Sequence, residues 1–262
     1  MRSQLVRPIL PACVIAAVVL GGLQGRAQAP AAAVRPYTGA RTADGKPNLN
    51  GIWQVVNEAH WDLEPHSADE GVPPGMGVVE GDTIPYQPWA AAKKKENYAN
   101  RTTLDPLHNC YLPGVPRITY VPFPFQIAQT PKHVAVAYEF AHTTRIIYTD
   151  GSNHAPPNDF WMGDSRGRWD KDTLVVDVTN FNDRTWFDMA GNFHSDALHV
   201  VERYTPIEAG QVMQYEATIE DPKVFTRPWK IGMPLYRRAE RNLQLLDYDC
   251  VDFFWRRMLS SR

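Results

Sequence analysis

The chain lacks an excess of basic residues, and this excludes the simplest kind of nucleic-acid binding. Lys and Arg together number 27, against 29 Asp and Glu. Proteins that bind nucleic acid through its phosphates carry a basic patch, whereas the one basic run here, residues 93–95, falls on an expected helix face. Gly-rich phosphate loops and internal repeats are also missing. The sequence therefore predicts no nucleic-acid partner, no P-loop nucleotide site and no solenoid.

Long hydrophobic runs are also scarce, and the clearest one lies near the amino terminus. Arg2 and Arg7 precede an apolar run over residues 9–23, and small residues follow it up to Ala27. Basic, apolar and small segments in this order are typical of a secretory signal peptide. The run is shorter than the about 20 residues of a membrane-spanning helix, and prolines interrupt its start. We predict that residues 1–27 are removed and that the mature protein is periplasmic or secreted, without a membrane span.

Cysteine is equally rare, with three residues in the whole chain. Cleavage after residue 27 removes Cys13, for which a lipoprotein anchor is a weaker alternative because a proline lies two positions before it. In an oxidising compartment the two that remain, Cys110 and Cys250, most simply form a disulfide. Two separately buried thiols are the alternative. Thiol titration with and without a reductant distinguishes the two cases.

Composition divides the mature chain into a leader and one domain. Residues 28–47 are rich in Ala, Pro and Gly and show no apolar period, which predicts a flexible leader. A single domain is expected over residues 48–262. Within it, Pro88 opens an alanine-rich stretch that ends at Tyr98. Because proline is accepted in the first turn and alanine favours helix, this stretch predicts a short helix.

From residue 118 onward the pattern becomes that of β-strands, because β-branched and aromatic runs alternate with turns. The expected strands are residues 51–56, 133–140, 143–149, 167–169, 173–179, 198–204, 211–219, 235–239 and 244–250. Short strands that follow one another without helices form a meander, and closure of a meander removes its exposed edges. We therefore predict an all-β fold, an antiparallel up-and-down, lipocalin-like barrel with one short helix and long loops. Such a barrel can hold one small ligand.

Several motifs resemble those of a broad group of uncharacterised exported bacterial proteins. They include Cys110–Arg117, the Gly-x-Trp-x-x-Asp-Thr-Leu hairpin at 167–174, His-Ser-x-Ala-Leu-His at 194–199 and Glu-Arg-Tyr at 202–204. The hairpin is also similar to hairpins of lipocalin-like barrels, which supports the fold by analogy. The resemblance implies export and a β-barrel, and it implies no particular reaction.

The densest group of reactive side chains lies around residue 200. Alternation along the strand 198–204 places His199 and Arg203 on one face and Glu202 on the other, with His194 at the entrance of the strand. A histidine at a barrel mouth can carry protons near neutral pH. Ordinary hydrogen-bonded histidines are the competing interpretation. Ser195 next to His194 does not indicate a hydrolase, because adjacent residues on a strand point apart.

A second group surrounds the expected turn between the strands 133–140 and 143–149. A two-residue turn would set Tyr138 opposite Arg145 and bring Glu139 close to them. An arginine inside a barrel needs a carboxylate partner or an anionic ligand group, because an unpaired buried charge is costly. These residues are therefore candidates for substrate binding if they point inward.

Loop residues complete the candidate site. Asp183 can orient a proton carrier, and Trp161 and Trp186 can enclose an aromatic molecule. The histidine spacings match no zinc motif, so we predict no metal, although His142 or His154 leaves a metal site assembled in space as a minor alternative. Paired carboxylates such as Asp177 and Asp183 leave a glycosidase as another.

Together these groups predict an enzyme without a cofactor, of the lyase, isomerase or hydratase type, that acts on a small hydrophobic or aromatic molecule. Its expected acid and base residues are His194, His199, Glu139 and Asp183, and its expected substrate contacts are Arg145, Tyr138, Trp161, Trp186, Glu202 and Arg203. A noncatalytic lipocalin-like carrier is the first alternative, and a structural envelope domain with a packed interior is the second. A homo-oligomer remains compatible with the sequence.

Overall fold

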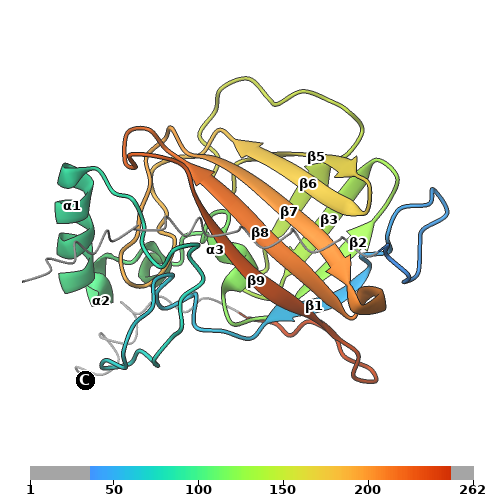
Figure 1. The fold of residues 1–262 in the computed structure, drawn as a ribbon, viewed down its shortest axis with the longest axis horizontal. Coiled ribbons are helices and arrows are strands. Elements are labelled where there is room, and N and C mark those ends of the chain that lie inside the picture. Colours follow the sequence, from blue (N-terminus) through green and yellow to red (C-terminus); the bar gives the residue numbers. More distant parts are fainter. Residues whose placement is uncertain (1–35, 249–262) are drawn as a thin grey trace, which may run out of the picture. The chain divides into compact units, whose positions relative to one another are not determined.

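The structure is a computed structural model that describes residues 36–248, and within this range nine strands close into a barrel (Figure 1). The strands are β1 (Gly51–Val55), β2 (Phe125–Gln129), β3 (His133–Tyr138), β4 (Thr144–Tyr148), β5 (Asp164–Asp170), β6 (Thr173–Thr179), β7 (His199–Ile207), β8 (Val212–Glu220) and β9 (Trp229–Arg238). The short helical segments are α1 (Pro88–Ala99), α2 (Arg101–Leu104), η1 (Pro106–Asn109), α3 (Arg117–Tyr120) and η2 (Glu208–Gly210). The predictions of an all-β barrel and of a helix at Pro88 are confirmed.

Alternating side chains explain why the strands curve around one interior. Along β7, Val200, Glu202 and Tyr204 are buried, while His199 and Arg203 are partly exposed. β7 pairs with β6 on one side and with β8 on the other. The two-residue period thus gives each strand an inner and an outer face, and the face expected for each of these residues is the one observed.

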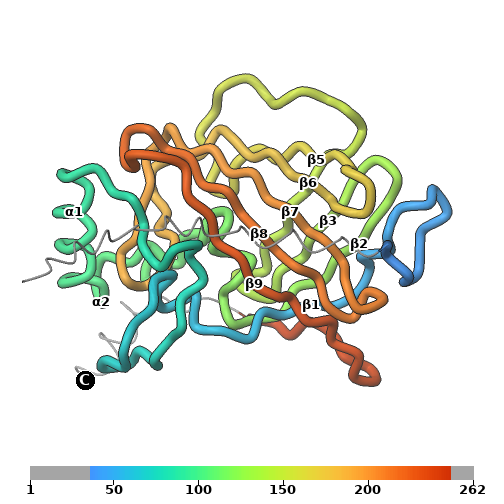
Figure 2. The backbone as a smooth tube through the Cα atoms, in the orientation of Figure 1, coloured from blue at the N-terminus to red at the C-terminus, as the bar shows by residue number. Residues whose placement is uncertain are grey.

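One strand pair departs from the predicted up-and-down order. β4 and β5 are parallel, and they are joined only through Ile147 with Ser165 and Tyr148 with Arg166. Every other neighbouring pair in the described barrel is antiparallel. Two parallel strands cannot be linked by a tight turn, so residues 149–163 must travel back along the barrel. Figure 2 traces this segment as the yellow-green arch above β5 and β6.

The hairpin between β3 and β4 has a different register from the expected one. Ala137 pairs with Thr144, and Val136 pairs with Arg145, so Tyr138 and Arg145 are not opposite each other. The turn is longer than two residues, because the backbone N–H of Tyr138 donates to the carbonyl oxygen of Thr143 over 2.9 Å, and Ala141 and His142 within the turn adopt positive φ angles of 57° and 45°. Both Tyr138 and Arg145 nevertheless point inward, with exposed fractions of 4% and 3%.

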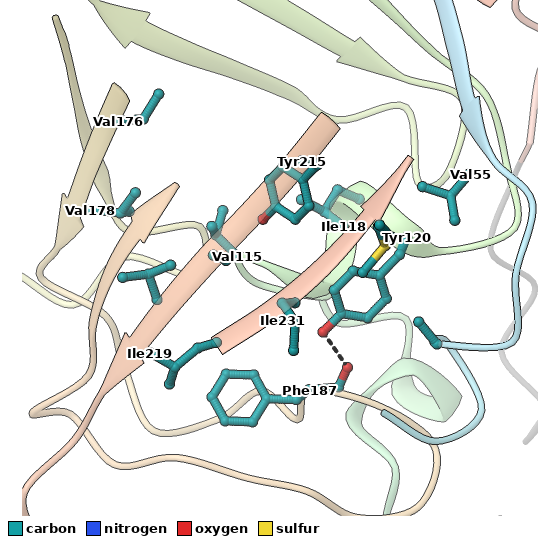
Figure 3. Packing of buried hydrophobic residues seen from close by; sticks show 14 of the residues in the cluster. Val55, Val115, Ile118, Tyr120, Val176, Val178, Phe187, Tyr215, Ile219 and Ile231 are labelled. Atoms are coloured by element: carbon teal, nitrogen blue, oxygen red, sulfur yellow. Dashed lines mark hydrogen bonds between the residues drawn. The ribbon is translucent and has the colours of Figure 1, made fainter. Parts of the chain in front are cut away.

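Two segments depart from the β pattern expected after residue 118. Residues 117–120 form α3, and its four residues are all buried. Figure 3 shows Ile118 and Tyr120 packed against side chains of the barrel, with the Tyr120 hydroxyl donating to the carbonyl oxygen of Phe187 over 2.8 Å. This helix closes one end of the barrel, where a strand would leave the end open. Residues 244–247 are not a strand either, because β1 already pairs with β9 and leaves no edge for another strand.

The described residues belong to one compact unit that begins at Pro36, inside the stretch expected to be a leader. The part of that stretch after Pro36 contacts the barrel, and Arg41 forms an ion pair with Asp172 over 2.8 Å. Figure 1 shows this blue segment at the end of the barrel opposite α1. The predicted signal peptide and Cys250 lie outside the described residues, so the disulfide with Cys110 stays a prediction. None of the helices in residues 36–248 has the length and hydrophobicity that a membrane crossing requires.

Candidate functional site

The structure does not bring the four expected acid and base residues together. His194 is buried between the rings of Phe181 and Phe187, at centroid distances of 6.0 Å and 5.3 Å. Both of its ring nitrogens are used, because Nε2 lies 2.6 Å from Oγ1 of Thr185 and Nδ1 lies 2.9 Å from the carbonyl oxygen of Ser195. Burial lowers the pKa of His194. The side chain is therefore a neutral, hydrogen-bonded core histidine with no nitrogen left for a substrate.

Glu139 and Asp183 come from different loops, and Asp183 acts on His194 only through its charge, which opposes the larger effect of burial on the pKa of His194. Glu139 sits at the β3–β4 turn, where its carboxylate accepts a hydrogen bond of 2.8 Å from the backbone N–H of Leu246. Asp183 is exposed on the loop after β6. Neither carboxylate makes a hydrogen bond to His194 or His199 within the described residues.

The two tryptophans expected to enclose a substrate have different surroundings. The ring of Trp161 contacts that of Tyr111 in a tilted arrangement with centroids 4.8 Å apart, and the guanidinium of Arg184 lies 5.9 Å from the Trp161 ring. Trp186 is buried, and its backbone forms an isolated bridge with Phe193. Trp161 therefore contributes to a surface aromatic cluster, whereas Trp186 contributes to the packed core.

Inside the barrel, Arg145 and Glu202 form a buried ion pair. Nη2 of Arg145 lies 2.5 Å from Oε2 of Glu202, and Nη1 lies 3.2 Å from Oε1. The hydroxyls of Tyr204 and Tyr215 both donate to Oε1 of Glu202 over 2.9 Å, and Nε of Arg145 donates to Oγ of Ser165 over 2.9 Å. The carboxylate partner expected for an inward arginine is thus Glu202. Because both oxygens of Glu202 are occupied, the pair is closed on itself.

Ser165 also shows why a motif needs its structural context. It is the serine of a Gly-x-Ser-x-Gly pattern, residues 163–167, which marks the nucleophile turn of α/β-hydrolases. That turn joins a strand to a helix and exposes the serine. Here Ser165 lies on β5, is 2% exposed and accepts a hydrogen bond from Arg145. The pattern therefore gives no nucleophile.

On the outer face of the barrel, five titratable side chains form one alternating chain of carboxylates and imidazoles. Asp164 Oδ2 lies 2.8 Å from Nδ1 of His154, and Nε2 of His154 lies 2.8 Å from Oδ1 of Asp177. Oδ2 of Asp177 lies 3.1 Å from Nε2 of His199, whose Nδ1 lies 3.7 Å from Oε2 of Glu220. We call these five residues the outer-face chain. Three of them, His154, Asp177 and His199, are about one-third exposed, so molecules from solvent can reach the chain.

The topology explains how residues so distant in sequence come together. Asp164, Asp177, His199 and Glu220 project outward from the consecutive strands β5, β6, β7 and β8. His154 comes from the arch that returns the chain from β4 to β5. The arch is held down at this point, since the backbone N–H of Ala155 donates to Oδ2 of Asp164 over 2.9 Å. A purely antiparallel meander would have a short turn here and no residue to complete the chain.

Hydrogen-bond chemistry fixes where the protons of the outer-face chain lie. An ionised carboxylate only accepts hydrogen bonds, and His154 lies between two carboxylates, with Nδ1 2.8 Å from Asp164 and Nε2 2.8 Å from Asp177. Burial by itself raises the pKa of Asp177, but the hydrogen bonds from His199 and His154 outweigh it and lower that pKa. Asp177 is therefore ionised at neutral pH, and His199 donates to it from Nε2.

Of the two histidines in the outer-face chain, His199 is the one with a ring nitrogen that is not hydrogen-bonded. With Nε2 donating to Asp177, the neutral ring carries its lone pair on Nδ1, which makes no hydrogen bond within residues 36–248. A histidine that a carboxylate orients through one nitrogen and that offers the other nitrogen to solvent has the arrangement of a general base. Glu220, 3.7 Å from Nδ1, stabilises the ring once it has taken up a proton.

An aromatic and cationic surface adjoins this base. Arg166, which pairs with Asp177 across β5 and β6, binds Asp164 through Nη2 over 2.9 Å and Nε over 3.1 Å. Its guanidinium lies 4.5 Å from the ring centroid of Tyr148, a partly exposed residue on β4. A flat ligand can therefore pack against this side of the barrel close to the outer-face chain.

The sequence analysis identified His199 as a candidate, but it did not predict that Asp177 and His154 would be its neighbours. From the sequence, His154 is expected only as a metal ligand, and Asp177 only as one carboxylate of a glycosidase pair. The described residues contain no group of three or more His, Cys, Asp or Glu side chains arranged to hold a metal ion. Outward alternation on β6 and β7 was a usable signal for Asp177 with His199, whereas nothing in the sequence placed the arch.

Comparison with known proteins assigns no family to this chain. No protein-family model matches the sequence, and no curated protein matches it significantly.

Proposed function

We propose that this protein is an acid–base enzyme that acts on a small hydrophobic or aromatic molecule at the outer-face chain, with His199 as the catalytic base. The observation that carries the proposal is the unequal environment of the two His199 nitrogens. Nε2 is tied to Asp177 over 3.1 Å, whereas Nδ1 faces solvent beside Glu220. Proton abstraction by an oriented histidine typically contributes 10²- to 10⁴-fold to a rate.

Each member of the outer-face chain has a defined role in this proposal. His199 Nδ1 removes a proton from the substrate, and the resulting imidazolium returns it to another position of the substrate, as in a lyase or an isomerase. Asp177 holds the ring in the required tautomer and offsets the new positive charge. His154 is a positioning residue, because both of its nitrogens are bonded to carboxylates 2.8 Å away.

The carrier alternative places the ligand inside the barrel, and the barrel as the structure shows it has little free space for one. The cavity there has a volume of only about 10 Å³. That is room for about one water molecule. The buried Arg145 already has Glu202 as its partner, so it offers no unpaired charge to an anionic ligand. The outer-face chain, by contrast, is open to solvent and can meet a substrate without any change in the barrel.

The decisive experiment compares variants on compounds that the protein transforms. A diverse library of small molecules is incubated with the mature protein and analysed by mass spectrometry. Each compound that changes is then assayed with His199→Gln and Asp177→Asn. We expect both substitutions to lower turnover by about 100-fold or more, since one removes the base and the other its orientation.

The matched control is Glu216→Gln, which neutralises an exposed carboxylate on the same strand, β8, as Glu220 and on the same outer face. It should retain full turnover. Equal turnover by His199→Gln and Glu216→Gln would contradict the proposal. Binding of library compounds without any turnover would instead favour the carrier.

Export forms the second part of the proposal. The basic, apolar and small segments of residues 1–27 and the resemblance to exported bacterial proteins support a periplasmic or secreted location, in which Cys110 and Cys250 would be oxidised. Mass analysis of the protein isolated from a periplasmic fraction would show both the cleavage site and a mass two hydrogen atoms below that of the reduced chain.

A further inference from the structure

The barrel interior contains a second feature that the outer-face chain does not use. A cavity of about 10 Å³ lies among side chains from β2, β3, β4, β6 and β7. Phe125, Ile147 and Leu174 are among its walls, and all three are buried. Apolar cavities of this kind stay dry, because water would lose hydrogen bonds on entering them.

One wall of this cavity does not come from the barrel strands. Leu49 precedes β1 and is 0% exposed, so its side chain fills space that the barrel would otherwise leave to the cavity. It belongs to the segment that Figure 1 shows in blue, at the end of the barrel opposite α1. Leu49 thus fills part of the barrel interior although it does not belong to any strand of the sheet.

Side chains at the mouth, rather than strand pairing, hold Leu49 in place. Its backbone N–H donates to Oε1 of Gln129 over 2.9 Å, and its carbonyl oxygen accepts from Nε1 of Trp53 over 2.9 Å. On either side, Arg237 donates to the carbonyl oxygens of Asn48, over 3.1 Å, and Asn50. The residue pairs of β1 begin at Gly51. Leu49 can therefore leave the mouth while every strand pair of the barrel stays intact.

We propose that the barrel interior is a binding site for a small, uncharged, apolar molecule, and that Leu49 is the resident plug which this ligand displaces. The space that such a ligand gains is the present cavity together with the volume of the leucine side chain. Apolar cavities of about 150 Å³ are known to accept one benzene ring. The ligand class follows as a single-ring or short-chain hydrocarbon group.

The polar groups beneath the cavity exclude charged ligands. Tyr204 lines the cavity, and its hydroxyl donates to Glu202, which is itself paired with Arg145. A charged ligand would find no free counter-ion there and would lose its hydration. This interior site shares no residue with the outer-face chain, so the two proposals stand or fall separately.

The test uses toluene as the probe and follows backbone amide shifts of the mature protein by nuclear magnetic resonance. In the unsubstituted protein, toluene should shift signals around Ile147, Leu174 and Tyr204. Gln129→Ala removes one fastening of the plug and leaves the cavity walls unchanged. It should tighten toluene binding by about threefold to tenfold, because the plug-out state becomes more populated. Leu49→Ala should tighten it further.

Leu63→Ala is the matched control, because Leu63 is 0% exposed but lies outside the cavity lining. It should leave toluene binding in the barrel unchanged. Should Leu49→Ala fail to fold, Gln129→Ala carries the test alone. Absence of toluene binding to the unsubstituted protein, or an unchanged affinity in Gln129→Ala, would overturn the proposal and make Leu49 a permanent core residue. Shifts centred away from the three reporter residues would overturn it as well.

Discussion

Replacing Arg145 by methionine is expected to lower the free energy of unfolding by about 3–5 kcal/mol, because Glu202 would keep a buried negative charge without its partner. The side chains of this pair are 2% and 0% exposed, so water cannot take the place of the lost guanidinium. Urea unfolding followed by tryptophan fluorescence measures the change.

Two companion variants separate this explanation from a general sensitivity of the barrel. Arg203→Met breaks an ion pair with Asp170 on the outer face, where Arg203 is 39% exposed, and should change stability by less than about 1 kcal/mol. Replacing Arg145 and Glu202 together by methionine should recover much of the loss, because no unpaired charge remains. A double variant as unstable as Arg145→Met would show that packing, not charge, causes the loss.

The second large effect concerns the pH dependence of stability and rests on Asp188, which is 0% exposed. Its carboxylate accepts from the backbone N–H of Leu63 over 2.9 Å and from Nδ2 of Asn192 over 2.5 Å. Burial, reinforced by the negative charge of Asp62, raises the pKa of Asp188 to about 7. In the unfolded chain the same carboxyl titrates near pH 4.

Between pH 4 and pH 7 the native protein therefore holds a proton that the unfolded chain has released. Stability from this group is fully present below about pH 4 and is lost as the pH rises to 7, by about 1.4 kcal/mol per pH unit. We expect the stability advantage of the unsubstituted protein over Asp188→Asn to shrink by about 4 kcal/mol over that range. Urea unfolding at several pH values measures it.

Asp69→Asn is the control for this titration, because Asp69 is an exposed carboxylate bound to Tyr98 and Arg101. Its substitution should not reproduce the pH-dependent difference between pH 4 and pH 7. A constant stability difference between the unsubstituted protein and Asp188→Asn across that range would contradict the raised pKa.

The barrel was predictable because its signal is local. The run Thr173–Thr179 carries β-branched residues and follows a tight turn, and it forms β6 with the expected bounds. Alternation then placed Glu202 and His199 on opposite faces of the strand without knowledge of any neighbour, and the structure puts Glu202 inside and His199 outside. Arg117–Tyr120 shows the limit of such reasoning, because the β pattern was expected to begin near residue 118, yet these four residues form the buried helix α3. Tertiary burial there outweighs local preference.

The candidate site was less predictable because its geometry depends on contacts far apart in the chain. His154 and Asp177 meet only because β4 and β5 are parallel, and no local pattern signals the direction of a strand. His194 illustrates the opposite error: a histidine next to a serine and an aspartate in sequence looks reactive, yet Thr185 and the backbone of Ser195 satisfy both of its nitrogens. Closeness in sequence therefore does not show whether a side chain is exposed or whether its hydrogen-bonding atoms are already occupied.

The short parallel junction between β4 and β5 also affects where the barrel can open locally. Only two residue pairs hold this junction, so we expect its backbone amides to be less protected from exchange than those of the other strand pairs. His154 contacts Asp164 on β5, and Arg166 on β5 packs over Tyr148 on β4, so residues of the proposed site also help to hold this junction together. A substitution at His154 or Arg166 would therefore alter the proposed site and this junction together.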